Sequence, residues 1–332
     1  MAYKVSGTES IKDDKTVVFE TITATQRRAA FTSIGAYASF GYNMGGSVPV
    51  VDTIEKYPFS SDANSTDVGD LTSPSYVATG NQSSVNGYVS GDGNFAKANR
   101  IEKFPFSSDA NATDVGDLTQ ARFGTAGQSS ITHGYISGGA EETGPSNGTN
   151  VIDKFPFSTD TNASDVGDLS ITRGGSSGQT SSTHGYTSGG LSNLYAPPFI
   201  LYNTIDKFPF SSDGNASDVG DLTQARYSLA GQSSDASGYV SGGTGLGIPP
   251  YNTIDKFPFS SDANATDVGD ISTRSDLAGT SSSASGYSHG GANPPGTDLF
   301  SRIDKFSFSS DGNATTVGDL LAAKQYTAGA QG

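Results

Sequence analysis

The sequence predicts an all-β fold made of six repeated four-stranded units, and three observations carry this prediction. The segment IEKYPFSSDANSTDVGDL at Ile54 returns with small changes at Ile101, Ile152, Ile205, Ile254 and Ile303. A Gly-Tyr pair followed by small residues and glycine precedes each of these copies. No stretch keeps the apolar period of about 3.6 residues that is typical of an amphipathic helix. The chain is therefore an array of β units.

The spacing of the copies predicts how these units assemble. Their starts are 47, 51, 53, 49 and 49 residues apart, which is the size of one four-stranded propeller blade. We therefore expect a six-bladed β-propeller with four antiparallel strands per blade over residues 31–332. Its repeats lie near 31–77, 78–124, 125–175, 176–227, 228–276 and 277–325. Residues 1–30 form an N-terminal segment with a candidate ring-closing strand near 16–25, and residues 326–332 resemble the start of another first strand.

The turn residues divide each unit into its four strands. In the third repeat we expect strands near Gly124 to Ser130, Gly134 to Ser137, Val151 to Ser158 and Asp165 to Ser170. The third strand carries two phenylalanines spaced by two residues in most copies, as at Phe155 and Phe157. Residues spaced by two lie on the same side of a strand, and in a propeller that side faces the neighbouring blade. These phenylalanines should therefore form the core between blades.

Composition excludes several classes of function. The 332 residues contain no cysteine, so disulfides, thiol nucleophiles and cysteine-ligated metals are excluded. A net charge of −15 argues against binding to nucleic acid or to anionic lipid. No apolar run approaches the roughly 18 residues of a spanning helix, and the start MAYKVSGTES lacks an apolar signal core. We expect no membrane insertion and a mature chain that begins near Met1.

The acidic residues repeat with the units. Four repeat positions, numbered 55, 62, 67 and 70 in the first copy, supply 23 of the 34 acidic residues. A catalytic pair of acids needs unlike surroundings, and repetition gives like ones, so no catalytic residue is predicted and the chain is expected not to be an enzyme. No cofactor is predicted either. Calcium is the alternative, because hard oxygen donors recur at short spacing, with candidate ligands Asp62, Asn64, Asp109, Asn111, Asp160 and Asn162.

The order of elements within a unit resembles the kelch repeat. A strand ending in Gly138-Gly139 precedes a strand with an aromatic residue, Phe155, and an arginine such as Arg173 stands before the next unit. The sequence departs from that family in having no tryptophan, in Asp92 at one double glycine, and in the loss of the arginine around Pro74. The resemblance covers residues 31–321 and implies architecture rather than chemistry.

Two further resemblances fall inside the same units. SSDANAT at residues 107–113 looks like the Asp-box of sialidases and other propellers, which caps the hairpin between the third and fourth strands. Its Asp and Asn residues suit a tight turn on physical grounds as well. The sequence KFPFSSDANATDVGDLTQAR, together with GYVSGG, resembles the repeats of kelch-like proteins of marine tailed bacteriophages, cyanophages especially. That resemblance implies a virion structural or appendage protein on the tail or head, present in multiple copies per particle.

The connection between the second and third strands varies most between copies. It runs from the short SVPVVDT to the long LSNLYAPPFILYNT. Loops on a rigid scaffold commonly carry recognition. We therefore expect a partner-binding face formed by Tyr195, Pro197, Pro198, Phe199, Ile200, Tyr202, Leu246, Ile248, Tyr251, Leu299 and Phe300.

These observations support a non-enzymatic virion protein that docks to other virion proteins and to a host surface glycan or protein. The alternatives are a sialidase-like glycan-processing propeller and a calcium-dependent carbohydrate-binding module. An enzyme should cluster asymmetric acid, base and arginine positions on one face. The arginines and acids of this sequence instead recur with the repeat, which favours the first hypothesis.

Overall fold

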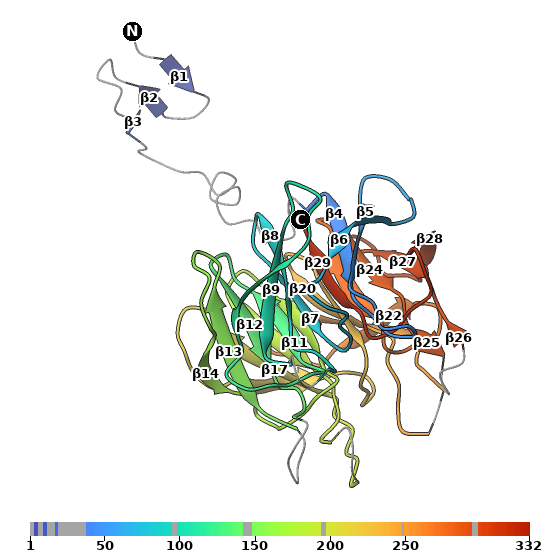
Figure 1. The fold of residues 1–332 in the computed structure, drawn as a ribbon. Coiled ribbons are helices and arrows are strands. Elements are labelled where there is room, and N and C mark those ends of the chain that lie inside the picture. The colour runs from blue at the N-terminus through green and yellow to red at the C-terminus, as the bar shows by residue number, and fades with distance from the viewer. Residues whose placement is uncertain are drawn as a thin grey trace. The chain divides into compact units, whose positions relative to one another are not determined.

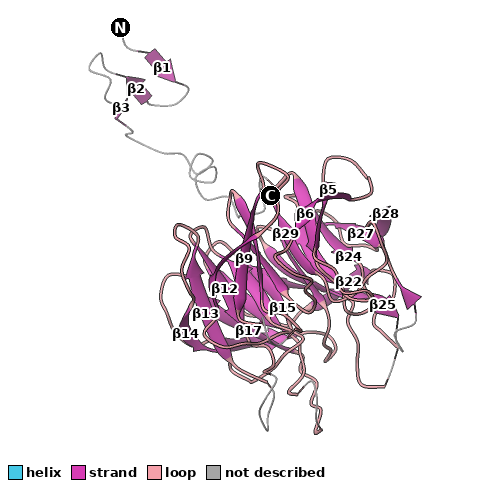
Figure 2. Cartoon of the chain, in the orientation of Figure 1, coloured by secondary structure: helices cyan, strands magenta, loops and turns pink. Residues whose placement is uncertain are grey.

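In the computed structural model, the described part of the chain consists of strands, turns and loops, with no helix (Figure 2). The structure describes residues 3–5, 9–11, 17–18, 38–94, 98–141, 148–193, 197–247, 249–293 and 298–332. The chain divides into two units, Met1–Ser33 and Ile34–Gly332. In the first unit, β1 (Tyr3–Val5), β2 (Glu9–Ile11) and β3 (Val17–Val18) form one antiparallel sheet.

The second unit is a propeller of six blades, each with four antiparallel strands (Figure 1). Blade 1 contains β29 (Ala328–Gln331), β4 (Phe40–Met44), β5 (Thr53–Pro58) and β6 (Thr66–Asp70), and blade 2 contains β7 (Thr79–Gln82), β8 (Asn86–Ser90), β9 (Arg100–Pro105) and β10 (Thr113–Asp117). Blade 3 contains β11 (Ala126–Ser129), β12 (His133–Ser137), β13 (Val151–Pro156) and β14 (Ser164–Asp168), and blade 4 contains β15 (Ser177–Thr180), β16 (His184–Ser188), β17 (Thr204–Pro209) and β18 (Ser217–Asp221). Blade 5 contains β19 (Ala230–Ser233), β20 (Ser237–Ser241), β21 (Thr253–Pro258) and β22 (Thr266–Asp270), and blade 6 contains β23 (Ala278–Ser281), β24 (Ser285–His289), β27 (Arg302–Ser307) and β28 (Thr315–Asp319). The predicted fold class is confirmed.

Blade 1 is assembled from both ends of the propeller unit. The C-terminal strand β29 pairs with β4, with Ala328 opposite Met44 and Gln331 opposite Gly41, and the two strands lie side by side in Figure 1. The inner strand β29 of this blade is thus held by hydrogen bonds to β4, a strand from the other end of the unit. The candidate ring-closing strand at 16–25 falls mostly outside the described residues, and within them β3 pairs with β2.

The first strands of all six blades lie innermost and contact one another around the axis. Each has a glycine at its second position, and a Cβ atom there would collide with the inner strand of the preceding blade. On Gly178, for example, a Cβ would lie 2.0 Å from the carbonyl oxygen of Gly127. Only glycine lets six strands approach this closely.

A closed circle of backbone hydrogen bonds lies just before these inner strands. Six equivalent residues, one in each repeat, form the circle. Each donates its N–H to the backbone carbonyl of the equivalent residue in the preceding repeat, with N···O distances of 2.7–2.9 Å. The six residues are Val77, Gly124, Gly175, Ser228, Asp276 and Tyr326, and all have positive φ. The left-handed conformation is strained for residues other than glycine, so the circle of bonds offsets a local backbone cost.

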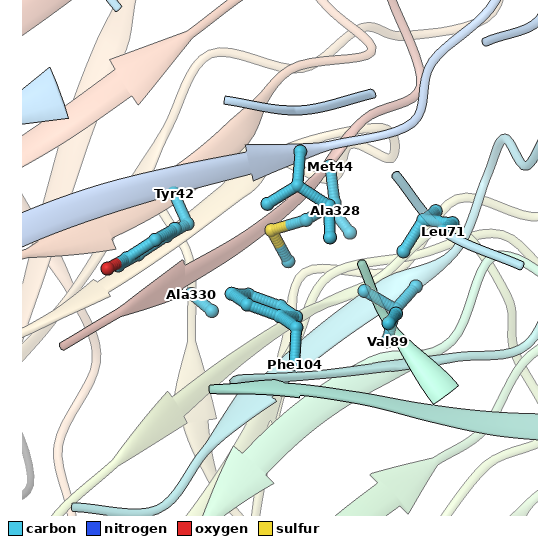
Figure 3. Close-up of a cluster of buried hydrophobic side chains, with 9 residues drawn as sticks. Tyr42, Met44, Leu71, Val89, Phe104, Ala328 and Ala330 are labelled. Carbon is cyan, nitrogen blue, oxygen red and sulfur yellow. The ribbon is translucent and has the colours of Figure 1, made fainter. Parts of the chain in front are cut away.

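The apolar core consists of six clusters, each between two adjacent blades. Figure 3 shows the cluster in which Tyr42 and Met44 of blade 1 meet Val89 and Phe104 of blade 2. The Tyr42 ring also stacks on Phe106 with a centroid distance of 4.9 Å. The prediction that the phenylalanines of the third strands pack between blades is confirmed, and the tyrosines of the Gly-Tyr pairs lie in the same clusters.

The inner glycines give a first test of the fold. We expect Gly178→Ala to lower the free energy of unfolding by about 1–3 kcal/mol, the usual cost of overpacking. Gly214 provides a matched control, because a Cβ there meets nothing within 4 Å. Gly214→Ala should be neutral or stabilise by up to about 1 kcal/mol. Urea unfolding of both variants measures the difference, and equal midpoints would contradict close packing at the axis.

Candidate binding face

The charged residues at the repeat positions mostly contact the neighbouring blade. A lysine on the third strand of each blade forms an ion pair with the hairpin aspartate of the next one, as in Lys56–Asp109 at 2.6 Å and Lys103–Asp160 at 2.6 Å. The last pair, Lys305–Asp62, connects blade 6 to blade 1 and completes the ring. The aspartates remain more than half exposed, so each pair adds little free energy by itself.

The Asp-box-like hairpins also dock onto the preceding blade through their asparagines. The Oδ1 atom of Asn111 accepts a hydrogen bond from the backbone N–H of Asp70 at 3.1 Å. Asn64 and Asn162 make the same contact with Asp319 and Asp117. The six candidate calcium ligands, Asp62, Asn64, Asp109, Asn111, Asp160 and Asn162, therefore all take part in contacts between blades.

The recurrent arginines form buried ion pairs. Arg122, Arg173, Arg226 and Arg274 pair with Asp153, Asp206, Asp255 and Asp304 at 3.0–3.2 Å. All four guanidinium groups have no exposed surface, and burial lowers their pKa from the ordinary value. Arg173 also donates to the carbonyl oxygens of Thr204 and Thr187. These arginines are structural and do not reach a surface ligand.

Blade 2 replaces the missing arginine from a different position. Ser75 stands where four other copies have arginine and the last has Lys324, and Arg100 of β9 instead pairs with Glu102 at 2.9 Å. Asp92, which interrupts a double glycine, lies 3.8 Å from the same guanidinium and is almost fully buried. Burial raises the pKa of the Asp92 carboxyl. Both departures from the kelch pattern therefore belong to one local rearrangement.

Many of the remaining repeat acids lie on the fourth strands. Asp67 and Asp114 are exposed on β6 and β10, which are the outer strands of their blades. Exposed edge strands can pair with other chains, and charged side chains disfavour such pairing. This acidic rim accounts for much of the net negative charge.

Two faces of the propeller differ in character. We call "loop face" the one with the connections from second to third and from fourth to first strands, and "hairpin face" the one with the other connections. Among the described residues, eight large hydrophobic side chains are exposed. Six of them lie on the loop face, namely Val48, Val50, Phe199, Ile200, Leu246 and Leu321, and two on the hairpin face, Val85 and Ile131.

The structure separates the predicted binding residues into two groups. Pro197, Pro198, Phe199, Ile200 and Leu246 are exposed. Tyr202, Tyr251, Leu299 and Phe300 are half-buried. Tyr195 and Ile248 lie outside the described residues.

The half-buried residues follow from how the loops fold back. The backbone N–H groups of Tyr202, Tyr251 and Phe300 bond to carbonyls of the double glycines that end the second strands, at 2.8–2.9 Å. In blade 6 a small hairpin of β25 (Ala292–Asn293) and β26 (Asp298–Leu299) adds to this, and the Arg302 guanidinium lies over the Phe300 ring. The end of each long loop is thus part of the scaffold, and its tip carries the exposed groups.

Sequence analysis missed three exposed residues of the loop face, Val48, Val50 and Leu321. The connection SVPVVDT is short, and its valines gave no signal beyond their position next to Pro49. Exposure of Val48 reaches 60% and that of Leu321 reaches 56%. The exposed groups of the loop face therefore belong to two sets of blades, 4 and 5 with Phe199, Ile200 and Leu246, and 6 and 1 with the other three.

No protein-family model matches the sequence, and no curated protein matches it. In the part of the chain that the structure describes, no helix is long and apolar enough to span a membrane. Within the same residues, no group of three or more His, Asp or Glu side chains gathers closely enough to hold a metal ion.

Proposed function

We propose that this chain is a non-enzymatic docking protein that binds other proteins through the loop face of a rigid propeller. The amino-acid sequence of its repeats resembles that of kelch-like proteins of marine tailed bacteriophages. On this proposal it is a surface component of the virion, on tail or head, and its partners are other virion proteins and a host surface protein or glycan.

One observation carries the proposal. The recurring lysines, arginines, hairpin aspartates and aromatic groups are engaged in contacts within the propeller, while most exposed large hydrophobic residues of the described chain lie in the loops of one face. Apolar and aromatic groups held on a rigid frame favour protein binding, because little ordering entropy is lost on association. Phe199 and Ile200, directly after Pro197-Pro198, are the best placed of these groups.

The enzymatic alternative receives less support from the same contacts. A sialidase-like site would need arginines that reach a sugar carboxylate, and the four recurrent arginines are fully buried in ion pairs. The calcium-dependent alternative would need hairpin oxygens that already bind Lys Nζ or backbone N–H groups. These contacts favour docking over either alternative.

The test compares the two faces of the same protein. We expect the triple variant Phe199→Ser, Ile200→Ser, Leu246→Ser to lower incorporation into phage particles, or adsorption of those particles to host cells, at least tenfold. Loss of a few exposed anchor residues commonly costs about 2 kcal/mol or more at an interface. The matched control is Val85→Ser with Ile131→Ser, which removes exposed groups from the hairpin face that are even more accessible than Phe199, Ile200 and Leu246.

The outcome also depends on a folded protein. Both variants change only exposed side chains, so their thermal midpoints should stay close to that of the parent chain. A hairpin-face variant that loses incorporation while the loop-face variant retains it would overturn the proposal.

A further inference from the structure

The junction between blade 6 and blade 1 differs from the other five. Here β29 follows β28 in the chain but joins blade 1 only through hydrogen bonds to β4. The ring can therefore open between β29 and β4 while the chain connections from β28 to β29 and from β4 to β5 stay intact. Separation requires β29 and blade 6 to leave β4, β5 and β6, and β29 also to leave its neighbour β7 of blade 2. Several buried polar side chains make contacts across this junction, and the equivalent positions of the other blades hold apolar or hydroxyl side chains. We call this junction the seam.

At the seam, His289 at the end of β24 contacts Asn43 of β4. The distance from His289 Nδ1 to Asn43 Nδ2 is 2.7 Å, and neither side chain has exposed surface. Asn43 also donates to Thr327 Oγ1 at 2.8 Å. The His289 ring meets the edge of the Tyr57 ring, whose hydroxyl bonds to Thr280 Oγ1 at 2.5 Å.

The other blades provide an internal comparison. The positions equivalent to His289 hold Met44, Ser90, Ser137, Ser188 and Ser241. Where the next blade offers a hydroxyl, two hydroxyl groups meet, as in Ser137–Thr187 and Ser241–Ser288, both at 2.7 Å. The seam alone has a titratable group at this position.

The surroundings of His289 disfavour a positive charge. Arg274 and Lys324 are the cations near it, and the carboxylates in this part of the seam, Asp304 and Glu55, are already bound to them. The Nε2 atom of His289 has no hydrogen-bond partner. Burial, followed by repulsion from Arg274 and Lys324, lowers the pKa of His289 to about 3.

We propose that His289 makes the ring acid-sensitive, so that lowering the pH opens the propeller at the seam between blades 6 and 1. A proton on the imidazole would add a third cation to a buried site that has no free carboxylate. Opening hydrates the imidazole and separates it from Asn43 and Tyr57. The released edge of β4 would then be available to another strand.

The sign and size of the effect follow from linkage. In the closed ring the pKa of His289 is below its ordinary value of 6.5, so the open state binds more protons. Closure is therefore fully stable above about pH 6.5 and weakens as the pH falls toward about 3. The opening equilibrium should rise about tenfold at about pH 5.5 and about a hundredfold at about pH 4.5, relative to neutral pH.

Hydrogen exchange of the intact protein tests the proposal. After correction for intrinsic exchange, amides of β29 should lose protection by these factors, while amides of β19, the equivalent strand of blade 5, should not. His289→Ser, which installs the residue of blades 2 to 5, should abolish the pH dependence at β29, and His289→Gln provides a second non-titrating variant. His184→Ser is the matched control, because this half-buried histidine of blade 4 lies away from the seam.

Each result decides the question. Selective loss at β29 in the parent chain, flattened by either His289 variant and retained in His184→Ser, supports the proposal. Parallel loss at β19 and β29 in the parent chain overturns it, even if neither His289 variant folds. An unchanged pH dependence in a folded His289 variant overturns it as well.

Discussion

Replacing Arg173 with leucine is expected to lower the free energy of unfolding by about 3–5 kcal/mol, the usual cost of removing one member of a buried ion pair. The guanidinium lies 3.0 Å from Asp206 Oδ2, and neither side chain is exposed. Leucine would leave the Asp206 carboxylate with only Ser170 as a partner. It would also remove the hydrogen bonds to the Thr204 and Thr187 carbonyls.

Two controls separate this loss from a general effect of removing charge. In the double variant Arg173→Leu, Asp206→Asn the asparagine stays neutral and still accepts from Ser170, so most of the loss should be recovered. Lys154→Ala removes a cation whose partner, Asp213, is 58% exposed, and it should cost less than about 1 kcal/mol. Urea unfolding gives all three values. A similar loss for Lys154→Ala and Arg173→Leu would contradict the structural role of the buried pair.

The repeat made the fold accessible to sequence reasoning. The repeat period, the Gly-Tyr pairs and the spacing of Phe155 and Phe157 together predicted six blades with aromatic residues between them. These signals are local, because a strand, a turn and a side of a strand are encoded within a few residues. The predicted strands of the third repeat accordingly match β11, β12, β13 and β14 within a few residues.

Long-range polar pairing was not accessible in the same way. Arg122 and Asp153 are both recurrent, but nothing in their spacing indicates that they form a buried pair. Asn43 and His289 are 246 residues apart and each occurs once at its repeat position. Such single departures look like drift in a sequence, and only the closed ring brings them together.

The binding residues illustrate the same limit. Aromatic content and proline predicted one exposed loop face but could not distinguish loop tips from loop ends. Tyr202 and Phe300 are half-buried because backbone hydrogen bonds return their loops to the double glycines. Phe199 and Ile200 are exposed because they lie nearer the tip of the loop than Tyr202 does. Burial in a loop depends on tertiary contacts that alternation and composition do not encode.

Removing residues 328–332 is expected to lower the free energy of unfolding by more than about 5 kcal/mol, which approaches the whole stability of a typical domain. The truncation deletes β29 and leaves the inner edge of β4 unpaired. It also exposes Tyr42 and Met44, which pack with Ala328 and Ala330 in the cluster of Figure 3. Circular dichroism and size-exclusion chromatography should therefore report an unfolded or associating chain.

A synthetic peptide of residues 323–332, added to the truncated chain, should restore the folded monomer. The truncated chain still contains every strand that contacts β29. The matched control is the same peptide with Gly329→Val. A Cβ on Gly329 would lie 2.3 Å from the carbonyl oxygen of Gly279, so this peptide should fail even though valine favours strands. Equal rescue by both peptides would mean that β29 closes the ring through β4 pairing alone, without close packing against the inner strand of blade 6. A truncated chain as stable as the parent would show that blade 1 does not need its C-terminal strand.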